Sequence, residues 1–337
     1  LKELNCENNS IQKLDLRQNP KLEKLICNKN QLTQLDLSKN PDIYYLNCSE
    51  NQLEQLDVSH LKALENLDCS HNDLEQLDVR NSKFLRALYC SWNRLTELDA
   101  DVSHKFQLVS VECQNNQLTS LSLGQNKLLK KLNCANNQLT QLNLNNMIAL
   151  EELKCQNNQL TALDVSSSPN LTTLVLKNNH LTSLNLDSNP HLDFSITDVY
   201  HSDFNNVYTV TLNPDRTFDL SSLPGDFEIN RVTGWVNGKA NGNILTVDEG
   251  TTVVYYGYRC ITGMMDASFT LDVTGTGGTV PPVTPPSGGD NPGGGSTPGG
   301  STPGGGSTGG GDGGGAVVIV AAVGAAVAGV VGYGVYN

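Results

Sequence analysis

Residues 22–42 read LEKLICNKNQLTQLDLSKNPD, and variants of this stretch follow one another along the first 192 residues. The cysteine recurs at a spacing of 21 residues six times and of 23 residues once. A fixed period of this length indicates a solenoid, a chain wound into stacked coils. We count nine copies, and the ninth has Leu176 in place of the cysteine. The cysteines of the first eight copies are Cys6, Cys27, Cys48, Cys69, Cys90, Cys113, Cys134 and Cys155.

The apolar residues of each copy predict how the coils stack. A single coil cannot bury its own apolar edge, so the leucines are expected to point inward and share one core. The segment L-x-x-L-x-C predicts a short strand, and successive strands predict a parallel sheet with coils about 4.8 Å apart. The cysteines are expected to pack as free thiols, because buried cysteine behaves as a small hydrophobe. Disulfides are disfavoured because stacked side chains point the same way, and metal-type spacing of two to four residues does not occur.

The run CNKNQLTQLDLSKN at 27–40 resembles the repeats of bacterial internalins, leucine-rich-repeat proteins, and specifically those with a cysteine ladder in 21-residue repeats. The resemblance covers residues 1–192 and implies an α/β-type solenoid rich in β, right-handed, with a parallel sheet. It also implies surface display and adhesion to host proteins or glycans. In such repeats the asparagine three residues after the cysteine turns inward, where its amide can satisfy backbone groups. Asn30, Asn51 and Asn72 are expected to belong to such a ladder.

One copy departs from the family pattern. The fifth copy, LTELDADVSHKFQL, carries two extra residues, which are expected to bulge on the convex side. The helical cap with which the family begins is not visible in this sequence.

The concave face of the sheet is the first candidate for a binding surface. Large exposed aromatic residues are common binding anchors, so Tyr45, Tyr89 and Trp92 are predicted to form a central patch. The further candidates are His71 and the flanking charges Lys24, Lys29, Lys131 and Lys154. The alternative is that all of these are ordinary solvated strand residues. The second half-repeat, L-x-x-L-D-L, also alternates, so a second strand on the opposite face could be the functional one instead.

Catalysis and nucleic-acid binding are not indicated. None of the six histidines has the spacing of a metal site or of a nucleophile's partner, so we expect no enzyme, metal or cofactor. The net charge of −13 leaves no basic stripe for a phosphate backbone. A recurrent aspartate column is better explained by turns than by paired general acids, which need carboxylates in different environments. Its members are Asp15, Asp36, Asp57, Asp78, Asp99 and Asp164.

The leucine period stops at about residue 193. Residues 193–274 alternate apolar runs with turn-rich pieces, which predicts a small antiparallel, all-β, immunoglobulin-like sandwich. In proteins resembling internalins, such a domain caps the last coil. Trp235 is expected to fill the core of this sandwich, and Cys260 to be a buried free thiol.

The C-terminal sequence predicts a linker and a membrane segment. Residues 275–315 are nearly all Gly, Pro, Ser and Thr, which predicts a disordered spacer. Residues 316–336 hold no charge and are long enough for a transmembrane helix. A lipid-anchor signal is a minor alternative, and no L-P-x-T-G sorting motif supports cell-wall attachment.

These features together predict a membrane-anchored cell-surface adhesin or recognition protein. Its repeats would bind a host or neighbouring-cell protein or glycan through the concave face. The alternative is a membrane receptor that signals through a cytoplasmic part.

Overall fold

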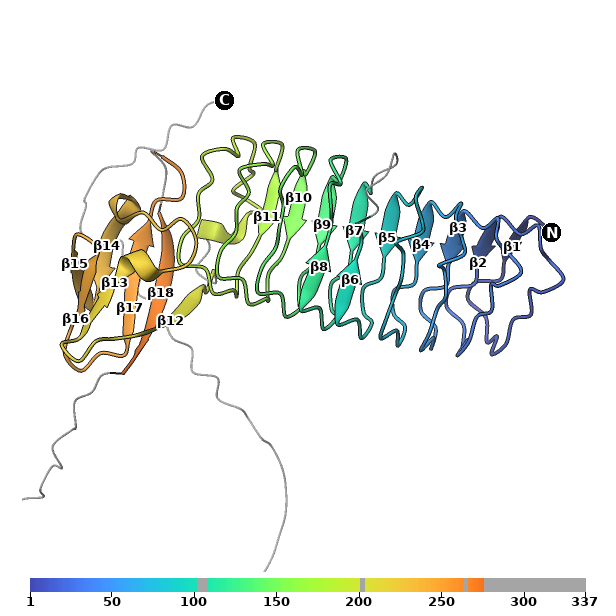
Figure 1. The fold of residues 1–337 in the computed structure, drawn as a ribbon, viewed down its shortest axis with the longest axis horizontal. Coiled ribbons are helices and arrows are strands. Elements are labelled where there is room, and N and C mark those ends of the chain that lie inside the picture. The colour runs from blue at the N-terminus through green and yellow to red at the C-terminus, as the bar shows by residue number, and fades with distance from the viewer. Residues whose placement is uncertain (102–107, 201–203, 263–265, 276–337) are drawn as a thin grey trace, which may run out of the picture. The chain divides into compact units, whose positions relative to one another are not determined.

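The computed structural model describes residues 1–101, 108–200, 204–262 and 266–275. Residues Leu1–Thr276 form one compact unit, which holds the repeats and the domain that follows them. Figure 1 shows the short strands of the repeats following one another along this unit, with the strands of the second domain beside the last coil. We number the coils 1 to 9 by their cysteine, with Leu176 in coil 9.

One parallel sheet of nine strands runs through the repeats, one strand to a coil. Each strand holds three residues that directly precede the cysteine, and the middle residue points into the core. The register joins equivalent residues of successive coils, so Leu25 pairs with Leu46. The two extra residues of the fifth copy leave this register intact, since Leu88 pairs with Val111. The strands are β1 (Glu3–Asn5), β2 (Lys24–Ile26), β3 (Tyr45–Asn47), β4 (Asn66–Asp68), β5 (Ala87–Tyr89), β7 (Ser110–Glu112), β9 (Lys131–Asn133), β10 (Glu152–Lys154) and β11 (Thr173–Val175).

The return half of each coil is made of turns, so the α/β-type description was wrong for the described residues. These residues contain no α-helix, and their three 3-10 turns all follow the repeats: η1 (Asp198–Tyr200), η2 (Leu220–Ser222) and η3 (Ile229–Arg231). The half-repeat L-x-x-L-D-L is too short for a helix and is bent instead by its aspartate. Asp36 Oδ1, for example, accepts the backbone N–H of Ser38 at 2.9 Å. The turn interpretation of the aspartate column is therefore confirmed.

A second, small sheet lies on that return side. Strands β6 (Glu97–Asp99) and β8 (Ser120–Ser122) pair in parallel in coils 5 and 6. The prediction that the second half-repeat could form a strand is thus confirmed, but only for these two coils among the described residues.

Leucines and cysteines fill the core of the repeats. Cysteines 27 to 155 are fully buried, and all of the chain's cysteines are free. Burial raises the pKa of the Cys27 and Cys134 thiols from the usual 9.0 to about 12, and it raises the pKa of Cys90 well above 9.0. The thiols thus serve as small hydrophobes, as predicted.

The burial of these thiols predicts that the folded state is less stable at alkaline pH. The pKa of a buried thiol such as Cys27 is higher in the folded state than in the unfolded state. The contribution of the buried thiols to the free energy of unfolding is therefore complete below pH 9 and is lost as the pH rises towards about 12. We expect the urea midpoint to fall on going from about pH 8 to about pH 10. The fall should be smaller in a Cys90→Ala variant, whose absolute stability is lower throughout. Equal falls in the two proteins would contradict this explanation.

In the described part of the domain after the repeats, seven strands form two sheets. Trp235 is half-buried and packs against Tyr256 with ring centroids 5.1 Å apart, and Cys260 is buried, both as predicted. The sheets are not wholly antiparallel, because the first strand pairs in parallel with the last. The immunoglobulin-like order remains a prediction. The strands are β12 (Val207–Thr211), β13 (Thr217–Asp219), β14 (Val232–Val236), β15 (Gly238–Asn241), β16 (Ile244–Val247), β17 (Val253–Tyr258) and β18 (Ala267–Thr274).

This domain closes the last coil, as expected. The buried carboxylate of Asp198 accepts the backbone N–H groups of Leu176 at 3.0 Å and Lys177 at 2.8 Å. The hydroxyl of Tyr256 donates to the carbonyl of Thr182 at 2.5 Å. Backbone groups that a tenth coil would have paired thus find partners here.

The predicted spacer 275–315 and membrane segment 316–336 lie outside the described residues, except for Gly275. Among the residues that are described, no helix has the length and apolar character to span a bilayer.

Candidate ligand-binding face

A column of inward-pointing asparagines, most of them buried, fixes the turn after each strand. Asn30 Nδ2 donates to the carbonyls of Cys6 and Cys27, both at 3.0 Å, and its Oδ1 accepts the N–H of Ile11 at 3.0 Å. Asn51 and Asn72 repeat this pattern one and two coils later. The prediction for these three residues is confirmed, and each ties its own coil to the one before.

The residue directly before each asparagine of this column adopts a left-handed backbone conformation. In all nine coils its φ lies between +50° and +58°, a region that asparagine and glycine enter readily and other residues rarely. We call these nine residues the left-handed column: Asn8, Lys29, Glu50, His71, Trp92, Asn115, Asn136, Asn157 and Asn178. Coils 2 to 5 are thus the ones that place a residue other than asparagine there.

The four exceptions form two contacting pairs of exposed side chains. Lys29 Nζ lies 3.6 Å from Glu50 Oε1. The rings of His71 and Trp92 are stacked, with centroids 5.4 Å apart and an interplanar angle of 14°. Trp92 is 52% exposed, the largest exposed fraction among the aromatic residues Tyr44, Phe84 and Trp92.

The outward strand residues, which we call the strand face, hold the two predicted tyrosines. Tyr45 and Tyr89 are both half-buried. Lys24 Nζ lies over the ring of Tyr45, 5.5 Å from the ring centroid. Tyr89 shares coil 5 with Trp92, whereas Tyr45 lies two coils away in another column. The structure therefore stacks His71 on Trp92 and places Tyr89 in the same coil as Trp92, while Tyr45 and Lys24 form a separate contact in coils 3 and 2.

The predicted flanking lysines do not form one positive border. Lys131 and Lys154 lie in coils 7 and 8 and share Glu152, at 3.7 and 2.5 Å. The hydrogen bond from Lys154 is the main cause of a lowered Glu152 pKa. Exposed pairs of this kind contribute little stability, and they leave coils 7 and 8 with little net positive charge on the strand face.

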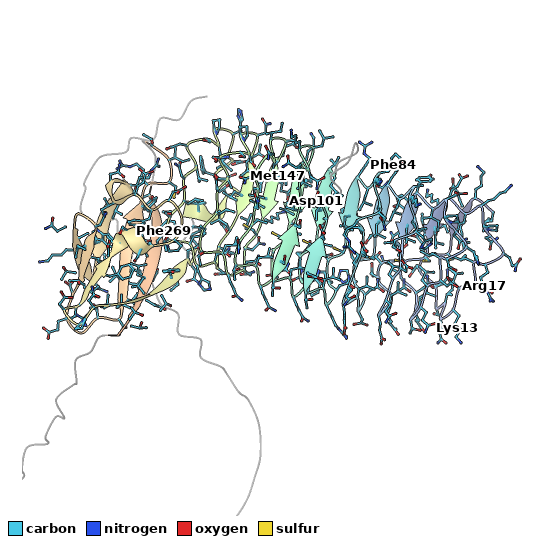
Figure 2. The ribbon with its side chains drawn as sticks, in the orientation of Figure 1. Lys13, Arg17, Phe84, Asp101, Met147 and Phe269 are labelled. Atoms are coloured by element: carbon cyan, nitrogen blue, oxygen red, sulfur yellow. The ribbon has the colours of Figure 1, made fainter. Side chains whose placement is uncertain are left out.

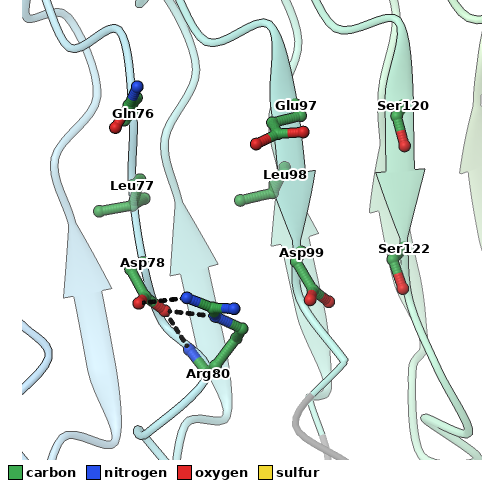
Figure 3. Close-up of a pocket in the computed structure, with 9 residues that line it drawn as sticks. All are labelled: Gln76, Leu77, Asp78, Arg80, Glu97, Leu98, Asp99, Ser120 and Ser122. Carbon is green, nitrogen blue, oxygen red and sulfur yellow. Dashed lines mark hydrogen bonds and ion pairs between the residues drawn. The ribbon is translucent and has the colours of Figure 1, made fainter.

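The opposite side of the repeats has a hollow of about 440 Å³ (Figure 3). It lies against β6 and β8, and is lined by Glu97, Asp99 and the serines of β8. Arg80 donates to both carboxylate oxygens of Asp78, at 3.0 and 2.8 Å, and so holds the Asp78 pKa low. This is the alternative face left open by the sequence.

One long edge of the repeats carries aromatic residues that the sequence analysis missed. Tyr44 and Phe84 are 36% and 42% exposed and border a shallow hollow with Glu23, Asp42 and Glu65. Figure 2 labels Phe84 on this edge and Lys13 and Arg17 on the other. The sequence analysis did not identify the left-handed column either.

The described residues contain no group of histidine, cysteine, aspartate or glutamate that could hold a metal ion. What the strand face and the left-handed column offer is a surface of aromatic rings, amides and paired charges. Such a surface is suited to binding.

The chain is similar to leucine-rich-repeat proteins of solved structure. The functional domain of InlJ from Listeria monocytogenes, which includes a cysteine ladder, is 25% identical over 81% of this chain and 86% of its own, with a TM-score of 0.36. The internalin inlF of the same species is 26% identical over 57% of this chain and 65% of its own (TM-score 0.42). YopM from Yersinia enterocolitica is 27% identical over 52% and 41% (TM-score 0.42). No family model and no curated protein matches the chain.

Proposed function

We propose that this chain is a cell-surface adhesin, a recognition protein that binds a protein on another cell or in its matrix. The binding surface is the strand face of coils 2 to 5 together with the left-handed column beside it. The observation that carries the proposal is the run of four left-handed residues, Lys29, Glu50, His71 and Trp92, in consecutive coils.

The left-handed backbone of these four residues is strained, and the fold alone does not explain why they are not asparagine. Five other coils build the same turn with asparagine at nearly the same φ, so the fold itself does not require larger side chains. A non-glycine residue held in this region costs of order 1–3 kcal/mol, and such strain is concentrated at functional sites. Here the strained backbone presents a cation, an anion and two stacked rings at the surface.

The chemistry of this surface favours a protein partner. Tyrosine and tryptophan are enriched at the centres of protein interfaces, and polar groups surround them. Tyr89 and Trp92 would be the anchors, and the Lys29–Glu50 pair would lie at the rim. The predicted spacer and membrane segment, 275–336, would hold the unit at the cell surface.

The test removes the two anchors from the chain. Beads coated with the Tyr89→Ala/Trp92→Ala variant should adhere at least about tenfold less to cells and matrix proteins that bind the parent, because anchor residues dominate interface energies. The melting temperature should change little, since Trp92 is exposed and Tyr89 half-buried.

The matched control is Glu97→Gln/Asp99→Asn, which changes the hollow on the opposite side. Its adhesion should equal that of the parent. Adhesion lost in this control and kept in the aromatic variant would move the function to the opposite face.

A further inference from the structure

A second surface lies in coils 6 to 9, where the left-handed column is made of asparagine alone. Its amides are bonded in a row: Asn136 Nδ2 donates to Asn115 Oδ1 at 2.9 Å, Asn157 to Asn136 at 2.5 Å, and Asn178 to Asn157 at 2.6 Å. The row continues into the next domain, where Asn205 Nδ2 donates to Asn178 Oδ1 at 3.1 Å. We call these five residues the surface amide ladder.

The ladder leaves half of its hydrogen-bonding capacity unused. A side-chain amide has two N–H donors and an oxygen with two lone pairs, and each internal link uses one of each. Asn136, Asn157, Asn178 and Asn205 are exposed. With coils about 4.8 Å apart, the ladder repeats a donor and an acceptor over about 19 Å. Because its own bonds orient the amides, these groups are arranged before any ligand arrives.

In coils 6 to 8 the positions that flank the ladder carry amides but no charge, whereas in coil 9 they are Lys177 and His180. In coils 6 to 8 the residues one before and two after each ladder asparagine are Gln114, Gln117, Ala135, Gln138, Gln156 and Gln159. The side-chain oxygens of Gln114 and Gln156 are buried beneath this surface and have no hydrogen-bond partner among the described residues. The same positions in coils 4 and 5 include Asp73 and Arg94.

In the left-handed column, Trp92 of coil 5 directly precedes Asn115, the first residue of the ladder. Its backbone N–H donates to the carbonyl of Gln114 at 3.0 Å, which places coil 5 directly against coil 6. His71, in coil 4, covers one face of the indole. The other face is therefore directed towards coil 6, where the side chain in the column is the much shorter Asn115.

We propose that the surface amide ladder binds a neutral oligosaccharide, with one sugar ring against the indole of Trp92. Sugar hydroxyls both donate and accept, which matches amides that offer one donor and one acceptor at each step. The apolar C–H side of a sugar ring suits an aromatic face. The lack of lysine and arginine at the flanking positions of coils 6 to 8 disfavours sulfated or sialylated glycans there. This site shares Trp92 with the protein-binding face of coils 2 to 5, but its amides lie in coils 6 to 9 and its ligand is of another class.

The test is a glycan array probed with the full chain, followed by calorimetry with the neutral oligosaccharide that binds best. The variant Asn136→Gly/Asn157→Gly removes two amides but keeps the turn, because glycine adopts positive φ freely. We expect its affinity to fall at least about tenfold, given the contribution of a hydrogen bond. The matched control is Asn146→Gly, an exposed asparagine with φ +66° outside the ladder, and its affinity should be unchanged.

Three results would overturn the proposal: no neutral glycan bound, tighter binding of anionic glycans, or unaltered affinity in the double glycine variant. A fourth would be loss of adhesion to a protein partner in that variant, which would make the ladder part of the protein interface. The Asn136→Gly/Asn157→Gly variant keeps Trp92 and is read by its glycan affinity, whereas Tyr89→Ala/Trp92→Ala is read by adhesion to a protein partner. Either proposal can therefore fail alone.

Discussion

Replacing Asn72 with alanine is expected to lower the free energy of unfolding by about 3–5 kcal/mol. The Asn72 amide donates to the carbonyls of Cys48 at 3.1 Å, Cys69 at 3.1 Å and Ser70 at 3.3 Å. Its Oδ1 accepts the N–H of Leu53 at 2.9 Å. One side chain therefore satisfies four backbone groups in two coils. At 8% exposure, little water can replace it, so the groups left behind stay unpaired.

Urea denaturation followed by circular dichroism measures this loss. Asn72→Asp should be at least as damaging, because it turns the donor towards three carbonyls into an acceptor. The control is Asn81→Ala, an exposed residue with no side-chain hydrogen bond among the described residues. If the two alanine variants had the same midpoint, the buried asparagines would not be what joins the coils.

The stacking of the repeats could be predicted because the period encodes it directly. A residue that recurs every 21 positions must form a column, and leucine and cysteine in that column must be buried. Asn30 and Asp36 were predictable for the same reason, since their side-chain chemistry matches the needs of a turn. The return half of the coil was predicted less well, because the six residues of L-x-x-L-D-L are compatible with either a turn or a strand.

The left-handed column could not be predicted from side-chain types. Lys29, Glu50, His71 and Trp92 share no chemistry, and what unites them is a backbone angle. Aligning them with the asparagines of the other coils reveals the position, but not that its φ is positive. The pairing of Lys131 with Glu152 depends on contact between neighbouring coils. The parallel pairing of β12 with β18 joins strands some sixty residues apart, which local pattern cannot foresee.

Converting the four exceptions to asparagine should raise stability and abolish binding to the protein partner. In the variant Lys29→Asn/Glu50→Asn/His71→Asn/Trp92→Asn, each left-handed residue becomes one that tolerates this φ. The strain relieved is about 1 kcal/mol or more per residue. The lost Lys29–Glu50 pair and His71–Trp92 stack offset about 1–2 kcal/mol of this gain. We expect a net rise of at least about 2–3 kcal/mol in the free energy of unfolding.

The matched control is the same set changed to alanine. Alanine removes the side chains but is itself disfavoured at positive φ, so binding should be lost with no gain in stability. Urea midpoints and bead adhesion, measured on both variants and the parent, separate the two effects. An asparagine variant that still adheres would show that the partner does not use these side chains. An asparagine variant less stable than its alanine counterpart would show that the backbone angle is not where the strain lies, and the reason for placing function in coils 2 to 5 would be gone.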